Sequence, residues 1–172
     1  MRNLLMALAL LLAGCSVGID HYQGSQPTLR LEDYFQGRLV ARGMFQDYRD
    51  RVVKRFVVTI DANWQGDTGT LDEHFVYDDG STQRRVWTLK ALGDGRYSGT
   101  AGDVLGVAQG QARGMAFQWA YDLALAMDDG DTLTVGFDDW MYQLDDKHLV
   151  NRSTMTKFGV AVGQVTLFFE KQ

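Results

Sequence analysis

The stretch FQWAYDLALAM, residues 117–127, places a large apolar or aromatic side chain at every odd position and a small or polar one between them. Successive side chains of a β-strand point to opposite faces, so this alternation makes one face wholly apolar. On a helix the same residues would scatter their apolar groups around the circumference. The stretch therefore predicts a half-buried strand with Phe117, Trp119 and Tyr121 on its inner face.

The same period of two governs most of the chain from Gly37 onward. Alternation predicts strands within residues 39–45, 52–64, 71–77, 86–92, 117–127, 133–141, 149–155 and 162–169. Turn sequences rich in aspartate and glycine separate them, at 78–80, 93–95, 128–130 and 145–146. Recurrent glycines from Gly99 to Gly114 indicate bends or bulges in a curved sheet. Before Gly37 the pattern predicts only one short helical turn, within residues 29–35.

These strands predict an all-β fold, an antiparallel meander of about ten strands. An open sheet of that length leaves two unpaired edges, and closure into a barrel removes both. We therefore expect a closed β-barrel, with a two-sheet β-sandwich as the alternative.

The N-terminus is typical of a bacterial lipoprotein signal. A charged start, Met1–Asn3, precedes an apolar run from Leu4 to Ala13, which is too short to span a bilayer. The motif Leu12-Ala13-Gly14-Cys15 has the small residues and the thiol that a lipobox needs, and Cys15 is the only cysteine of the chain. Lipidation of Cys15 would hold the protein at a membrane, and Ser16 favours the periplasmic face of the outer membrane. A buried helix with an inert thiol is the alternative.

These observations divide the chain into three parts. Residues 1–14 are expected to be a signal peptide, residues 15–28 a lipidated cysteine with a flexible tether, and residues 29–172 a single barrel domain. The net charge of −5 and the lack of a basic block argue against nucleic acid as a partner. No internal disulfide is possible with one cysteine. We find no catalytic motif and no metal-ligand spacing, and we expect no cofactor.

The densest group of polar side chains lies in residues 137–159. Asp138 and Asp139 are adjacent on a predicted strand, so they must point to opposite faces, Asp139 with Phe137 and Met141, and Asp138 with Trp140 and Tyr142. If the next strand folds back on this one, Asn151 or Arg152 approaches an aspartate and forms a polar anchor or a structural ion pair inside the barrel. The candidate ligand-binding residues are Phe117, Trp119, Tyr121, Asp138, Asp139, Trp140, Asn151 and Arg152.

Four blocks of the sequence carry a resemblance to a known family. They are DYFQGRLVARGMFQD (33–47), LDEHFVYDDGSTQRRVWTL (71–89), residues 137–159, and VGQVTLFFEK (162–171). Together they resemble a proteobacterial lipoprotein family known as domain of unknown function 3833. That resemblance implies a lipidated envelope protein without an established activity, with a link to membrane lipid metabolism. DYFQGRLVARG is also similar to the opening strand of lipocalins, which implies a lipocalin-like (calycin-like) barrel, although Gly37-Arg38-Leu39 replaces the lipocalin Gly-x-Trp.

Three functions fit these features. The first is a membrane-anchored barrel that binds a fatty acyl chain or another small apolar ligand, such as a fatty acid or phospholipid. The second is an envelope assembly protein that recognises a partner through an apolar patch. The third is an enzyme acting on a lipid, with an acid such as Asp138, Asp139 or Glu73 beside Arg152 or Lys157, and it requires a carboxyl group with a perturbed pKa in a cleft.

Overall fold

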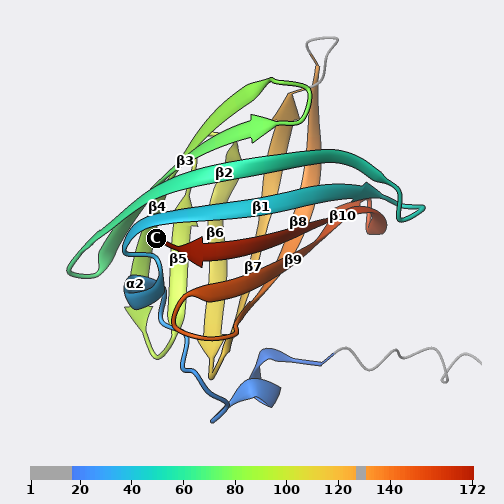
Figure 1. Cartoon of the computed structure of the whole chain (residues 1–172). Coiled ribbons are helices and arrows are strands. Elements are labelled where there is room, and N and C mark those ends of the chain that lie inside the picture. Colours follow the sequence, from blue (N-terminus) through green and yellow to red (C-terminus); the bar gives the residue numbers. More distant parts are fainter. Residues whose placement is uncertain (1–16, 127–130) are drawn as a thin grey trace, which may run out of the picture.

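The computed structural model describes residues 17–126 and 131–172, and it is a closed antiparallel β-barrel (Figure 1). Its ten strands are β1 (Gly37–Asp47), β2 (Val52–Gln65), β3 (Thr68–Tyr77), β4 (Thr82–Gly93), β5 (Arg96–Thr100), β6 (Val104–Arg113), β7 (Ala116–Ala126), β8 (Thr132–Gln143), β9 (His148–Lys157) and β10 (Val160–Lys171). Each strand pairs with its neighbours in sequence, and β1 pairs with β10 to close the ring, from Leu39 opposite Lys171 to Asp47 opposite Gly163. The predicted meander and its closure are confirmed, and the sandwich alternative is wrong.

Alternation in the sequence decides which side chains fill the barrel. On β7 the odd residues Phe117, Trp119 and Leu123 are buried, and on β2 the even residues Val58 and Ile60 are buried. Residues that are paired across neighbouring strands point to the same face of the sheet. The apolar faces of the strands therefore join into one interior. The core therefore lies inside the barrel, and the outer face is in contact with solvent.

The two ends of the barrel differ. Because every strand reverses direction, the turns after β1, β3, β5 and β9 lie at one end, which we call the mouth. At the other end, the base, the helical turn α2 (Leu31–Tyr34) precedes β1, as predicted. Leu31, Tyr34 and Phe35 are buried there, and the Tyr34 hydroxyl donates a hydrogen bond to the Lys147 carbonyl at 3.0 Å. The helical turn thus plugs the base.

The segment that precedes α2 lies against the outside of the base (Figure 1). Residues Ile19–Tyr22 form a 3₁₀ turn, η2, and the Tyr22 ring lies 5.5 Å from the ring of Tyr142. The Ser25 hydroxyl accepts a hydrogen bond from the Met115 amide at 3.0 Å. The polar composition of the tether predicted a flexible, solvated segment. From residue 19 onward it is instead held against the barrel by aromatic and backbone contacts.

The cleavage motif Leu12-Ala13-Gly14 and the lipidation residue Cys15 lie outside the described residues. Within the two described ranges no helix is both long and apolar enough to cross a membrane.

Glycine shapes the strands near the β5–β6 hairpin, as the recurrence of this residue predicts. The register of β6 against β7 shifts between Leu105 and Gln109, and Gly106 within this bulge has a φ of 74°, in the left-handed region that glycine adopts readily. The short β5 and the bulge let the loop of residues 101–103 reach Arg85 on β4, which points into the barrel. This loop supplies Asp103 to the candidate site.

Candidate ligand-binding cavity

A cavity of about 340 Å³ occupies the interior of the barrel. Leu31 and Phe35 of the base line one part of it, while Lys54, Tyr77 and Gln83 line the part near the mouth. Lys54 and Gln83 are exposed or half-exposed, so the cavity reaches solvent at the mouth and is closed at the base.

Aromatic and aliphatic side chains form most of the wall. Trp119 lies between Trp87 and Phe117, with ring centroids 5.7 Å and 5.3 Å away, and Tyr121 stacks on Phe137 at 5.3 Å. Aromatic rings in edge-on and offset contact hold one another in place. The cavity is therefore a space within a packed wall, which is the usual form of a site for a small apolar ligand.

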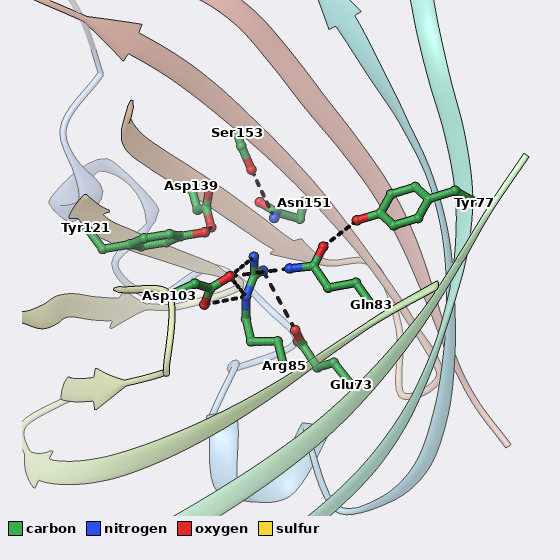
Figure 2. Close-up of polar contacts among 9 residues, drawn as sticks. All are labelled: Glu73, Tyr77, Gln83, Arg85, Asp103, Tyr121, Asp139, Asn151 and Ser153. Atoms are coloured by element: carbon green, nitrogen blue, oxygen red, sulfur yellow. Dashed lines mark hydrogen bonds and ion pairs between the residues drawn. The ribbon is translucent and has the colours of Figure 1, made fainter. Parts of the chain in front are cut away.

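A charged cluster interrupts this wall on β3 and β4 (Figure 2). Glu73 and Arg85 are opposite each other in the β3–β4 register, with an Nη1–Oε2 distance of 4.0 Å. Arg85 binds the Asp103 carboxylate through Nε at 2.9 Å and Nη2 at 2.7 Å. Gln83 joins the cluster because its Nε2 donates to Oδ2 of Asp103 at 3.5 Å, and its Oε1 accepts a hydrogen bond from the Tyr77 hydroxyl at 2.7 Å. The guanidinium of Arg85 is thus occupied by a carboxylate of the protein itself.

A second polar group projects from β7, β8 and β9 into the same cavity (Figure 2). The Tyr121 hydroxyl donates to Oδ2 of Asp139 at 3.0 Å, and Nδ2 of Asn151 donates to the Ser153 hydroxyl at 3.3 Å. Asp139 and Asn151 are only 4% and 3% exposed. Oδ1 of Asp139 and Oδ1 of Asn151 are buried and have no hydrogen-bond partner. A buried polar atom without a partner is rare and costly in a folded protein.

Burial changes the protonation of both inner acids. It raises the pKa of Glu73 to about 7, although Arg85 opposes the shift. It raises the pKa of Asp139 to about 6, although hydrogen bonding from Ser153 and Tyr121 opposes it, and the nearby Asp138 adds to the increase. Both groups therefore exchange protons near neutral pH, which an exposed carboxyl group does not do.

Arg85 and Tyr121, the other two ionisable groups, do not change their protonation state near neutral pH. Burial alone would lower the pKa of Arg85, but the hydrogen bonds that it donates to Asp103 and the charge of Glu73 raise it, so the guanidinium stays charged. Burial and the charge of Asp139 raise the pKa of Tyr121 well above its ordinary value, so its hydroxyl remains a donor. The site offers hydrogen bonding and proton exchange, and among the described residues no cluster of three metal-ligating side chains is present.

Five of the eight residues predicted to bind a ligand line the cavity. They are Phe117, Trp119, Tyr121, Asp139 and Asn151. The prediction that Asp138 and Asp139 face opposite sides is confirmed, because only Asp139 lies among the cavity residues.

The other three predicted residues are on the outer face. Asp138 accepts hydrogen bonds from Gln118 at 2.9 Å and from the Trp140 indole at 3.3 Å. Arg152 lies opposite Trp140 in the register, and its Nε is 3.4 Å from Oε1 of Gln164. The predicted Asp–Arg bridge through Arg152 inside the barrel is therefore wrong, since Asn151 takes the inward position on β9 and its neighbour must point outward.

Sequence reasoning missed Arg85, Asp103 and Gln83 as site residues, and it placed Glu73 only in the alternative of an enzyme. Glu73 could have been found, because it lies between Leu71 and Phe75 on the face of the strand that alternation predicts to be apolar. Lys157, the other cation of that alternative, does not line the cavity, and its ammonium lies 5.4 Å from the ring centroid of Phe158.

Fold and cavity together define a lipocalin-like β-barrel. One solved structure with this architecture is the S-type phycobiliprotein lyase CPES from Guillardia theta. It matches with a TM-score of 0.59 and 9% identity, over 91% of this chain and 98% of that chain. At this identity the similarity shows the fold alone.

The chain belongs to the family DUF3833, described as a protein of unknown function, which it matches over residues 9–171. The resemblance noted in the sequence is thereby confirmed for nearly the whole chain. None of the curated proteins matches the sequence significantly.

Proposed function

We propose that this protein binds an elongated apolar small molecule, such as a fatty acyl chain, inside the barrel. The observation that carries the proposal is the cavity of about 340 Å³, closed at the base, lined mainly by apolar side chains and open at the mouth. Ligand sites of proteins typically measure about 300 to 1,000 Å³ and combine apolar walls with a few polar groups.

A barrel filled only for stability would have a different interior. Protein interiors are close-packed, and voids larger than a water molecule are few. Here large rings such as Trp87, Trp119 and Tyr121 are packed against one another, and an open space remains among them. Glu73 and Asp139 in the wall are costly to bury, so packing alone does not account for them.

Filling the cavity is expected to abolish ligand binding. Val165 on β10 lines the cavity opposite Phe45 and Ser153, and Val165→Trp places an indole in the space that the ligand needs. The measurement is the fluorescence of N-phenyl-1-naphthylamine, a neutral apolar dye, titrated with full-length protein. We expect saturable enhancement with the wild type and at least tenfold weaker binding by the variant.

The matched control is Thr166→Trp, the same substitution at the neighbouring residue, which does not line the cavity. This control should bind the dye like the wild type. Equal binding by all three proteins, each with an unchanged circular dichroism spectrum, would show that the dye binds outside the barrel and would refute the proposal.

The second part of the proposal is that lipid on Cys15 anchors the protein to the periplasmic face of the outer membrane. The charged start, the short apolar run and the motif Leu12-Ala13-Gly14-Cys15 support it. Few residues separate Cys15 from the 3₁₀ turn at Ile19, which is held against the base. On this proposal the base lies toward the membrane and the mouth opens away from it, so the ligand enters from the aqueous side.

Removing the thiol tests the anchor. Cys15→Ala is expected to prevent lipidation and to remove the protein from the outer-membrane fraction, because the barrel itself carries no acyl chain. The measurement is fractionation of a cell envelope followed by immunoblotting, with Ser16→Ala as the control that keeps the thiol. If Cys15→Ala stays in the outer-membrane fraction and still needs detergent for release, the lipid anchor is wrong.

A further inference from the structure

We propose that the inner end of the ligand carries a hydrogen-bond donor, a hydroxyl or amine group on an apolar chain, and that this donor binds Oδ1 of Asp139 and Oδ1 of Asn151. The inference rests on the proposed function and specifies the chemistry of the bound molecule. It departs from the simplest acyl ligand, a fatty acid with an inward carboxylate.

Both acceptor atoms are buried, unpaired and near each other in the barrel wall. Asp139 on β8 is opposite Ser153 on β9, and Asn151 lies two residues before Ser153 on the same face of β9. The two residues are therefore diagonal neighbours across this strand pair, within reach of one small group. Both line the cavity, and their side chains project inward in Figure 2.

Three strong donors of this region already have partners. The Tyr121 hydroxyl is bound to Oδ2 of Asp139, the Asn151 amide to Ser153, and the Arg85 guanidinium to Asp103. None of the three binds Oδ1 of Asp139 or Oδ1 of Asn151, so both oxygens remain free acceptors. A ligand that satisfies the acceptors must bring its own O–H or N–H group.

Charge in the cavity also opposes an inward carboxylate. Glu73, Asp103 and Asp139 surround a single guanidinium, that of Arg85, and Asp103 already binds it in two places. A ligand carboxylate at this depth would add a fourth acidic group where like charges are poorly screened. The other cation that lines the cavity, Lys54, lies near the mouth, paired with Asp79 at 3.3 Å. An anionic ligand could therefore bind only with its head outward.

Three probes with the same ten-carbon chain test the inference: decanol, decylamine and decanoate. Each is titrated into the full-length protein below its critical micelle concentration, and binding is followed by calorimetry. We expect decanol or decylamine to bind at least tenfold more tightly than decanoate, because only these two supply a donor to the free acceptors.

A matched pair of variants locates the head group. Asp139→Asn keeps the shape of the side chain but replaces one acceptor with a donor, so the preference for decanol and decylamine should fall at least tenfold. Asp138→Asn makes the same change one residue away on the outer face, where Asp138 binds Gln118 and Trp140, and it should leave all three affinities unchanged.

The outcomes separate this inference from the proposed function. Equal or tighter binding of decanoate, weakened by Lys54→Met and not by Asp139→Asn, would overturn the inference and leave the apolar cavity as the binding site. An equal effect of Asp138→Asn and Asp139→Asn would also overturn it. If no probe binds and the naphthylamine dye binds wild type and Val165→Trp alike, both proposals fail.

Discussion

Gly110→Ala is expected to lower the free energy of unfolding by about 3 kcal/mol, since overpacking of side chains in close contact costs this order of energy. Gly110 lies on β6 directly opposite Trp119 of β7, on the inner face of the barrel. A Cβ atom at Gly110 would overlap the ring atoms of Trp119 and would lie 2.5 Å from Cζ of Phe117. Neither ring can retreat easily, because Phe117 also packs against Tyr97 and Trp119 against Trp87.

Denaturant unfolding of the purified variants measures this effect. Gly102→Ala is the matched control, because a Cβ at Gly102 meets no atom within 4 Å and its backbone is outside the left-handed region. The control should stay within about 0.5 kcal/mol of the wild type, as most exposed substitutions do. If Gly110→Ala loses no more stability than the control, the packing of the Trp119 indole does not require glycine at position 110.

The fold was predictable because the alternation of apolar and polar residues, which is visible in a short stretch of sequence, decides which face of each strand lines the barrel. In residues 117–125 every second side chain is large, and those side chains form one wall of the cavity. Asp-Gly turns at 78–80 and 93–95 fixed the strand ends, and Asp94 and Gly95 there have the positive φ angles that tight turns need. The beginning of β4 was missed, because the inward residues Gln83 and Arg85 are polar and hide the alternation.

The same local signal explains the success and the error at the candidate site. The alternation of side chains along β8 predicted that Asp139 lies on the same face as Phe137 and Met141, and that prediction is confirmed. Phase along β9 also distinguishes Asn151 from Arg152, because Leu149 and Met155 are the buried residues of that strand. The contact between Arg85 and Asp103 depends on a short strand, β5, and a bulge in β6. Such a contact depends on tertiary structure, and the periodicity of the sequence does not predict it.

The buried acids set a balance between stability and binding. A well-packed apolar residue in place of a buried charged group is often neutral or stabilising. Asp139 keeps one oxygen without a partner in this barrel, which costs stability in the absence of a ligand. Proteins tolerate such costs mainly at functional sites. The cost should therefore be measurable as a gain when the acid is removed.

Asp139→Asn is expected to raise the free energy of unfolding by about 3 kcal/mol at pH 8 and by about half as much at pH 5, where the unfolded carboxyl group is already ionised and the folded one is not. Burial raises the pKa of Asp139 to about 6 in the folded state, from its ordinary value of 3.8. The native state therefore binds more protons than the unfolded state from about pH 4 to pH 6, and the free energy of unfolding falls as pH rises through that window. Glu73, with a pKa raised to about 7, extends the same fall to about pH 7.

Urea unfolding at pH 5 and pH 8 measures the difference, and Asp79→Asn supplies a control of opposite sign. Hydrogen bonds from Ser81 hold the pKa of Asp79 at about 2, so this exposed carboxylate contributes stability above pH 4 and loses it only as the pH falls toward 2. Its substitution should have the same effect at pH 5 and pH 8. If Asp139→Asn also changes stability equally at both pH values, the folded carboxyl group is already ionised at pH 5, and burial does not raise its pKa. A ligand donor would then meet a carboxylate, not a neutral carboxyl group, at every pH between 5 and 8.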